Sequence, residues 1–286
     1  MKNCKLCPVA CGADRSRTKG YCGAGENLSI AKYYLHKYEE PVLSGTNGSG
    51  TVFFTGCSLR CAFCQNYAVS RAETGKEITP KELADIFIKL EDAGAHNINL
   101  VTPTQYVPQI CEAFGFYRPK IPVVYNTHAY EPTETLALID LYVDVYLPDL
   151  KFYTPEISAR YTSRKDYFAV ASEAVKFMMS RKKTVIEDGL MKSGVIVRHL
   201  VMPEGAKESR KIIDWFSENA TGDAYLSLMA QYTPFGDYKK FPELRRPVTK
   251  REYDGAVEYA ISKGVENCFI QQLGSAKESF IPEWDF

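Results

Sequence analysis

The chain has 286 residues, of which 45% are hydrophobic and 24% are charged, a balance that excludes a disordered or collagen-like protein. Thirty-five basic residues offset thirty-five acidic ones, so the net charge argues against binding to nucleic acid or to an anionic membrane surface. The first residues lack the apolar segment of a signal peptide, and no run approaches the roughly 18 apolar residues that cross a membrane. We therefore expect a cytoplasmic protein.

The chain begins with four closely spaced cysteines, which are Cys4, Cys7, Cys11 and Cys22. In a reducing compartment such a group is better interpreted as a metal site than as a disulfide framework. A segment this short builds no hydrophobic core, and a bound metal would supply the missing folding free energy. We predict a metal-binding segment over residues 1–45; the spacing leaves zinc and an iron–sulfur cluster open, and a metal-free loop is the alternative.

Beyond this segment the sequence predicts strands that alternate with helices. Short apolar runs rich in β-branched and aromatic residues predict strands at 51–55, 98–102, 123–127, 143–147, 195–202 and 225–232. Capping boxes at Thr79–Glu82 and Thr249–Glu252 predict two helix starts, and further helices are expected at 133–141, 166–179 and 206–219. This order predicts a parallel α/β domain over residues 46–286, with its functional groups at the carboxyl ends of the strands.

The strongest motif follows the first of these strands, where Cys57, Cys61 and Cys64 are spaced C-x3-C-x2-C. Three thiolates can hold a four-iron cluster and leave one iron without a protein ligand. An iron with open coordination sites can chelate the amino and carboxylate groups of S-adenosylmethionine. A single zinc ion is the main alternative, but zinc needs a fourth ligand and none lies nearby in sequence.

The motif CSLRCAFCQN resembles the signature of the radical S-adenosylmethionine (radical SAM) superfamily, in which an aromatic residue, here Phe63, precedes the third cysteine. Beyond residue 50 the chain resembles most the activating enzymes of pyruvate formate-lyase and other glycyl radical enzymes. The resemblance implies a partial (β/α)6 barrel of the TIM type. It also implies a [4Fe-4S] cluster that cleaves S-adenosylmethionine reductively to a 5′-deoxyadenosyl radical, which abstracts a hydrogen atom from the substrate.

The resemblance also implies roles for polar residues at the strand ends. In the activases one strand ends in Asp-Thr-Asn-Gly and the next in Asp-Leu-Lys; their acidic and threonine side chains bind a monovalent cation, and the lysine contacts the cosubstrate. The matching residues here are Asn126, Thr127, Asp149 and Lys151. Phe63 and Arg198 are further candidates for contact with S-adenosylmethionine, Arg198 through the carboxylate or the ribose.

Two departures from the activase pattern affect these expectations. Asn126 replaces an Asp and removes one negative charge from the cation site, which puts that site in doubt. The usual Gly-Gly-Glu after the second strand is absent, so Thr102 and Thr104 are the candidates to accept hydrogen bonds from the methionyl ammonium. Both threonines are equally consistent with a turn that starts the next helix.

Three functional hypotheses follow. The first is a radical SAM enzyme that activates a glycyl radical enzyme, with flavodoxin or ferredoxin as the electron donor. The second keeps the radical chemistry but changes the target to a small molecule, a peptide or RNA, although the neutral charge argues against RNA. The third is an iron–sulfur electron carrier or a zinc-stabilised interaction module. A domain with six strands is larger than an electron carrier needs.

Overall fold

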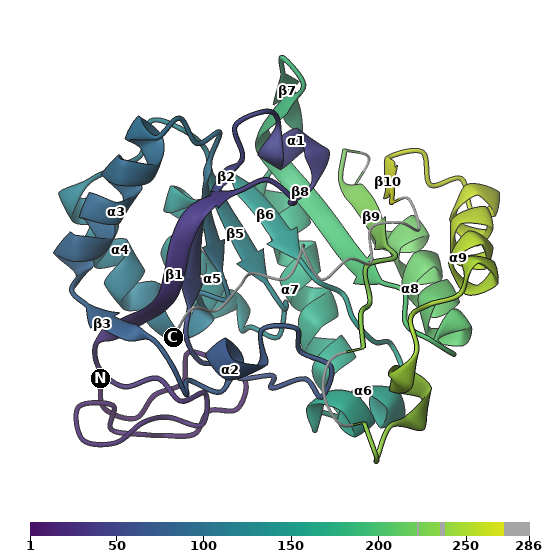
Figure 1. The fold of residues 1–286 in the computed structure, drawn as a ribbon, viewed down its shortest axis with the longest axis horizontal. Helices are drawn as coiled ribbons and strands as arrows, with labels where there is room; N and C mark the ends of the chain where they lie inside the picture. The colour runs from purple at the N-terminus through teal and green to yellow at the C-terminus, as the bar shows by residue number, and fades with distance from the viewer. Residues whose placement is uncertain (222, 235–237, 272–286) are drawn as a thin grey trace.

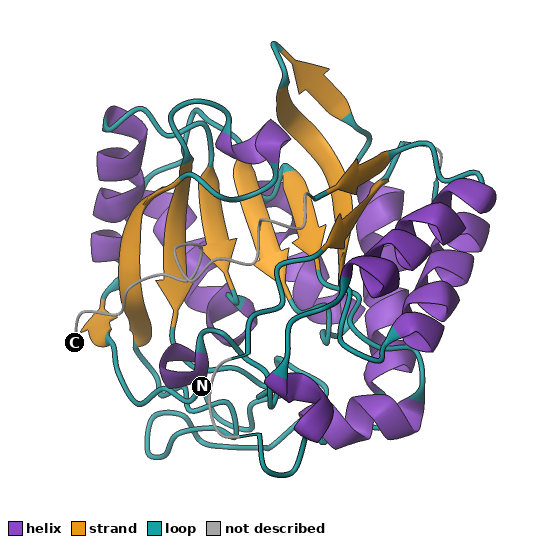
Figure 2. Ribbon diagram, turned by 45° about the vertical axis from the view of Figure 1, so that its right-hand side comes forward, coloured by secondary structure: helices purple, strands orange, loops and turns teal. Residues whose placement is uncertain are grey.

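Six parallel strands form the centre of the fold. In the computed structural model, which describes residues 1–221, 223–234 and 238–271, they lie side by side in chain order. These strands are β2 (Ser49–Phe54), β4 (Ile98–Val101), β5 (Val123–Thr127), β6 (Val145–Pro148), β8 (Leu190–Leu200) and β9 (Tyr225–Met229). They coincide with the six strands that the apolar runs predict, within a few residues at each end. Their arrowheads point toward the N-terminal segment (Figures 1 and 2).

Four shorter or peripheral strands extend this sheet. They are β1 (Leu28–His36), which runs antiparallel to β2, β3 (Lys76–Ile78), β7 (Val185–Glu187), which forms a hairpin with β8, and β10 (Cys268–Ile270). The strand order runs from β10 to β3, and these two end strands do not pair with each other in the described chain. The sheet is therefore an unclosed, mostly parallel barrel, which confirms the predicted fold class.

Helices cover the outer face of the sheet (Figure 2). The longer ones are α3 (Pro80–Asp92), α4 (Val107–Phe116), α5 (Thr133–Ile139), α6 (Pro155–Thr162), α7 (Tyr167–Arg181), α8 (Ala206–Asn219) and α9 (Lys250–Ser262). Both predicted capping boxes are present, because Thr79 and Thr249 each exchange hydrogen bonds with the glutamate three residues later. Short helices α1 (Pro41–Ser44) and α2 (Tyr67–Ser70) and the 3₁₀ turns η1 (Thr104–Tyr106), η2 (Asp140–Tyr142) and η3 (Pro242–Arg245) complete the elements.

The inside of the barrel is apolar at one end and polar at the other. At the amino ends of the strands, Leu43 of α1 packs with Val124, Leu147 and Ile196 in a buried cluster. At the carboxyl ends the interior opens into a cavity, described below. Across the unclosed side, Ser227 of β9 donates a 2.8 Å hydrogen bond to Glu40, which follows β1.

The start of the chain enters the sheet earlier than its composition suggests. Strand β1, with Leu28, Ile30 and His36 buried, pairs with β2, so the part of the chain before the sheet ends near residue 27. The Gly- and Cys-rich surroundings concealed this strand. The division into residues 1–45 and 46–286 thus remains a prediction, and residues 272–286 of it lie outside the described part. No helix of the described residues is long and apolar enough to span a membrane.

Candidate functional site

A polar cavity lies at the carboxyl ends of the parallel strands, where an α/β barrel places its functional groups. The three cysteines of the motif line one side of it, and polar or charged residues of β5 and β8 and of the segment that follows β6 line another. Every residue that the sequence assigns to the cluster or to S-adenosylmethionine lines this cavity except Thr104. These lining residues are Cys57, Cys61, Cys64, Phe63, Thr102, Asn126, Thr127, Asp149, Lys151 and Arg198.

The cysteine loop is held in place by backbone contacts on both sides. Gly56 has a φ of 82°, and a Cβ on it would lie 2.5 Å from the carbonyl oxygen of Cys22, so only glycine fits there. The Cys57 N–H donates to that same oxygen at 3.1 Å, and the Ala62 N–H donates to Tyr161 at 2.8 Å. The loop is thus fixed between the N-terminal segment and α6.

The three thiols suit a metal cluster better than they suit an empty cavity wall. Burial raises the pKa of each thiol, and the nearby Lys151 ammonium opposes this shift. Cys61 lies close enough to Cys57 and Cys64 for their charges to raise its pKa further. Iron binds the thiolate form, so a bound cluster would replace the three protons that burial holds on these neighbouring thiols.

The three thiols of the motif are compatible with a four-iron cluster, in which each thiolate binds a different iron. Within the described residues, no three His, Cys, Asp or Glu side chains converge on a point that could hold one metal ion, either in this motif or among the four N-terminal cysteines. No other cysteine of the described chain lines the cavity, so one iron would lack a cysteine ligand.

Opposite the cysteines, Arg198 is the centre of a buried polar network. Its Nε donates to Asp149 at 2.8 Å, its Nη1 to Glu39 at 3.2 Å and its Nη2 to Asn126 at 2.6 Å. Lys151 donates to the second oxygen of Asp149 at 2.7 Å. Burial alone would raise the pKa of Asp149, but Arg198 and Lys151 outweigh it and hold that pKa below its ordinary value.

This network changes the expected role of Asn126 and Arg198. The Asn126 carbonyl oxygen accepts from Arg198, so a neutral amide here satisfies a guanidinium instead of completing a cation site. Thr127 lines the cavity, but its hydroxyl donates to the buried carboxylate of Glu131. The hydrogen-bond partners that a buried arginine requires are thus supplied to Arg198 by other residues of the protein. Arg198 still lines the cavity.

The loop after β4 separates the two threonines. Thr102 lines the cavity with a φ of 56°. Thr104 is only 1% exposed and does not line the cavity, because the turn η1 buries it near Tyr125 and Glu131. The expected contact between Thr104 and a methionyl ammonium therefore does not fit this geometry. Between the two residues, the Gln105 side chain donates to the carbonyls of Thr55, Gly56 and Thr102.

His128 connects the cavity wall to the cysteine loop. Its Nδ1 accepts the Tyr130 N–H at 3.0 Å, so the neutral ring carries its proton on Nε2, 3.3 Å from the Ser58 hydroxyl. Burial lowers the pKa of His128, which keeps the ring neutral. His199, by contrast, points away from the cavity and contacts Leu150 and Ser209.

Two acidic residues of the cavity have no signal in the sequence. Glu39 and Glu40 lie between β1 and α1, in a segment without a motif, and both line the cavity. Glu39 pairs with Arg198. Glu40 is 5% exposed, accepts from Ser227 and forms no ion pair within the described residues. Burial raises the pKa of Glu40, although Arg198 opposes the shift. The cavity thus contains a carboxyl without a cationic partner.

The four N-terminal cysteines gather next to the cysteine loop but outside the cavity. A Cβ on Gly20 would lie 3.5 Å from the Cys11 sulfur and 3.7 Å from the Cys22 sulfur, so both sulfurs face the same turn. Burial raises the pKa of Cys7 to about 11, and the charges of the other three thiols add to the shift. The segment is anchored by Arg15, which is 2% exposed and donates to Gly25 and to Gln105.

Comparisons with known proteins agree with this geometry. The model of the radical SAM superfamily matches residues 51–216. An uncharacterized protein of Methanocaldococcus jannaschii is 34% identical over 270 residues, which cover 91% of this chain and 75% of that protein. Both matches include the cysteine motif and the strands β4, β5, β6 and β8.

Solved structures share the fold at low sequence identity. Streptococcus suis SuiB bound to its precursor peptide SuiA has a TM-score of 0.54 and 14% identity, over 77% of this chain and 48% of that one. The protein anSMEcpe, with bound S-adenosylmethionine and a peptide, has a TM-score of 0.50 and 13% identity, over 73% and 57%. This chain therefore spans about half the length of these structural neighbours.

Proposed function

The chain belongs to the radical SAM superfamily, and from that premise we propose that it is an enzyme that cleaves S-adenosylmethionine reductively and abstracts a hydrogen atom from a polypeptide. The proposal rests on one observation, which is that the motif cysteines and three charged residues line the same cavity. The cysteines are Cys57, Cys61 and Cys64, and the charged residues are Asp149, Lys151 and Arg198. Neither a structural zinc site nor an electron carrier needs a charged wall opposite its thiols.

The residues of the chain divide the work between two sides of the cavity. Cys57, Cys61 and Cys64 would hold the cluster, which together with S-adenosylmethionine supplies the 5′-deoxyadenosyl radical. Lys151 offers two further ammonium protons beyond the one it donates to Asp149, and these suit a carboxylate. Phe63 packs edge-on against Phe152, with ring centres 5.8 Å apart, and keeps this end of the cavity apolar.

A polypeptide target is supported by the open side of the barrel and by the likeness to activases. Among the described residues, the end strands of the sheet leave one side unpaired, which would give an extended chain a route to the cavity. Both structural neighbours described above were solved with a bound peptide. We therefore propose a glycine Cα–H of a partner protein, as in glycyl radical enzymes, as the first candidate for the abstracted hydrogen.

The test of the reaction class is release of 5′-deoxyadenosine. Anaerobically reconstituted protein with dithionite and S-adenosylmethionine should form this product. Cys61→Ala should lower the rate by more than about 100-fold, because losing a residue that binds the cluster directly costs more than losing one that only supports such a residue. Cys111→Ala is the matched control, since Cys111 lies on α4 outside the cavity. Product formation by Cys61→Ala at the parent rate would refute the cluster assignment.

The polypeptide target has its own test. A candidate glycyl radical enzyme, incubated with the reduced protein and S-adenosylmethionine, should show the doublet of a glycyl radical by electron paramagnetic resonance. Release of 5′-deoxyadenosine without that doublet, for every candidate, would leave the radical chemistry standing and exclude this substrate class.

We also propose that Cys4, Cys7, Cys11 and Cys22 bind a second metal centre, either zinc or an iron–sulfur cluster. The four neighbouring thiols and the buried cation of Arg15 beside Cys11 and Cys22 support it, because four thiolates around a metal carry net negative charge. Zinc would require the four thiols to draw together around one point, whereas a cluster would bind each thiol at a different iron. Metal analysis of Cys7→Ala decides the identity: loss of iron indicates a cluster and loss of zinc indicates zinc. An unchanged metal content would refute the site.

A further inference from the structure

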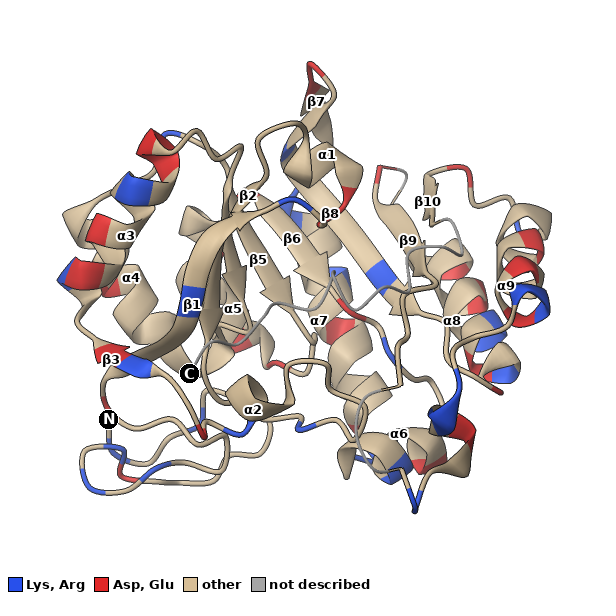
Figure 3. Cartoon of the chain, viewed as in Figure 1, with Lys and Arg blue, Asp and Glu red and all other residues tan. Residues whose placement is uncertain are grey.

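Three arginines gather on the outer side of the cysteine loop and have no role in the function proposed above. Arg60 lies inside the loop between Cys57 and Cys61, Arg71 follows α2, and Arg164 lies in the connection from α6 to α7. We call Arg60, Arg71 and Arg164 the arginine patch. Figure 3 shows basic residues along the loops on this side of the molecule, below α2.

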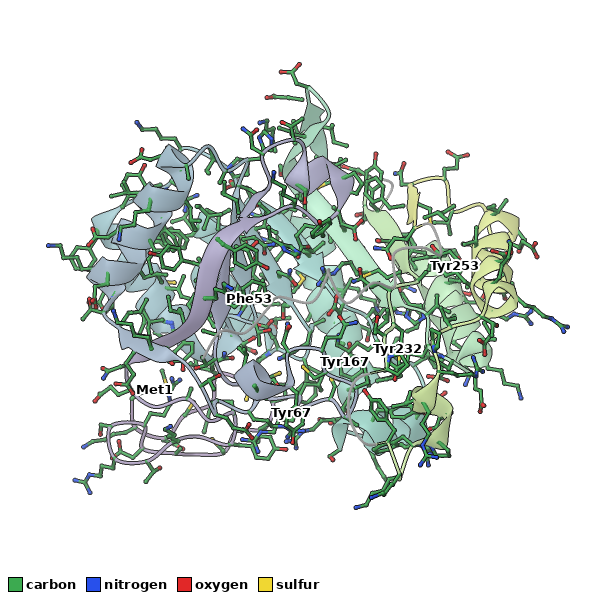
Figure 4. The ribbon with its side chains drawn as sticks, in the orientation of Figure 1. Met1, Phe53, Tyr67, Tyr167, Tyr232 and Tyr253 are labelled. Atoms are coloured by element: carbon green, nitrogen blue, oxygen red, sulfur yellow. The ribbon has the colours of Figure 1, made fainter. Side chains whose placement is uncertain are left out.

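Aromatic rings hold the patch together. The guanidinium carbons of Arg60 and Arg164 lie 4.7 and 4.5 Å from the centre of one ring, that of Tyr21, which is 37% exposed. Arg71 lies 4.9 Å from the ring centre of Tyr67, a residue labelled in Figure 4, and donates to the carbonyl of Arg60 at 3.3 Å. Three segments of the chain therefore bring like charges close together.

In the part of the chain that the structure describes, no carboxylate pairs with the arginine patch. Several arginines elsewhere in the fold are paired with acidic groups, among them Arg160, Arg181, Arg198 and Arg246. Within the described residues, none of the three patch arginines forms such a pair, and the Nε atom of each is buried without a hydrogen-bond partner. Since the whole chain is neutral, this local excess of positive charge marks a surface that suits an anionic partner.

The position of the patch indicates what that partner does. Arg60 belongs to the loop that carries the proposed cluster ligands, and Arg71 donates to the carbonyl oxygen of Arg60. Tyr21 precedes Cys22, whose carbonyl oxygen accepts from the Cys57 N–H. The patch therefore lies directly beside the loop that carries the proposed cluster ligands.

We propose that the arginine patch is the docking surface for an acidic one-electron carrier protein of the flavodoxin or ferredoxin type. The inference rests on the proposed function, because reductive cleavage of each S-adenosylmethionine consumes one electron. The docked carrier is oxidised by one electron and the cluster is reduced by one, and no other reactant is needed. Paired stacks of arginine on exposed tyrosine give a flat, adaptable surface of the kind found in protein interfaces.

The experiment compares two reductants on the same protein. Formation of 5′-deoxyadenosine by the reconstituted full chain is measured with dithionite, which needs no docking surface, and with reduced flavodoxin at increasing concentrations. The test variant is Arg71→Glu/Arg164→Glu. The control is Arg118→Glu, since Arg118 also stacks on two rings, those of Phe114 and Tyr142, but follows α4 on another side of the fold.

We expect the double variant to keep the dithionite rate within about twofold and to raise the KM for flavodoxin by about tenfold or more, with a weaker dependence on salt. The control variant should match the parent with both reductants. Arg71→Gln/Arg164→Gln removes the charges without reversing them and should give a smaller increase in KM. This variant keeps the test valid if the glutamate variant does not fold.

Three outcomes would overturn the proposal. The first is an unchanged KM for flavodoxin in both double variants. The second is an equal increase in the control. The third is loss of binding to a single-stranded RNA oligonucleotide in the double variants with unchanged flavodoxin kinetics, which would assign the patch to nucleic acid. Absence of product from the parent protein with dithionite would instead refute the proposed reaction, and the docking inference with it.

Discussion

The two cysteine-rich regions of this chain differ in what holds their sulfur atoms in place. The loop from Cys57 to Cys64 continues a buried strand, and its thiols face a cavity whose other walls belong to the sheet. Residues 1–27, all of which the structure describes, contain no helix or strand and are held by turns and by Arg15. The barrel therefore shapes the first site, whereas the second depends on what its thiols bind.

Metal removal tests this comparison most strongly. An anaerobic chelator should increase the rate of tryptic cleavage within residues 1–27 by at least about 1000-fold, because metal binding supplies most of the folding free energy of such a segment. The barrel should remain folded by circular dichroism. Cys61→Ala is the control, since it affects only the site that the barrel shapes; rapid cleavage in that variant would show that the two regions are not independent.

The buried network should tolerate change less well than the surface. Asp149→Asn leaves Lys151 and Arg198 with one carboxylate fewer, and we expect the free energy of unfolding to fall by about 3–5 kcal/mol. Asp254→Asn removes an exposed partner of Lys250 and should cost less than about 1 kcal/mol. Urea denaturation of both variants measures the two losses in the free energy of unfolding. Equal losses would mean that the buried network contributes no more to stability than an exposed ion pair.

The smallest expected effect concerns Glu40. Its carboxyl faces Ser227, Arg198, Glu39 and Asp149, and its pKa in the folded protein lies above the ordinary value of 4.5. The folded state therefore holds this proton more tightly than the unfolded chain, so its contribution to stability is full below that value and is lost as the pH rises. Glu40→Gln should be more stable than the parent near pH 8, by less than about 2 kcal/mol, and similar to it near pH 4. A parent that is the more stable protein near pH 8 would contradict this sign.

Local patterns were sufficient for the elements that the sequence predicts correctly. Apolar runs mark the parallel strands because both faces of such strands are buried, and the residue types of a capping box lie within four positions. The cysteine motif and the polar strand ends are equally local. That explains why Asp149, Lys151 and the three cysteines could be placed at one edge of the sheet before the fold was known.

Contacts between distant segments could not be predicted in this way. Glu39 reaches Arg198 only because β1 folds back along β2, and no spacing in the chain indicates that return. Tyr21 meets Arg164 across the surface for the same reason. Thr104 illustrates the opposite case, because one 3₁₀ turn after β4 was enough to move its side chain away from the cavity.

The unpaired side of the barrel has a consequence for how large a substrate can be. Neighbouring strands elsewhere share backbone ladders, whereas the described hydrogen bonds across this side are made by side chains, from Ser227 to Glu40 and from Gln65 to the carbonyl of Gln231. Breaking two such bonds costs about 1 kcal/mol each. A polypeptide of the kind proposed as substrate could therefore enter from this side without breaking a strand of the described chain, so its length would not limit its access to the cavity.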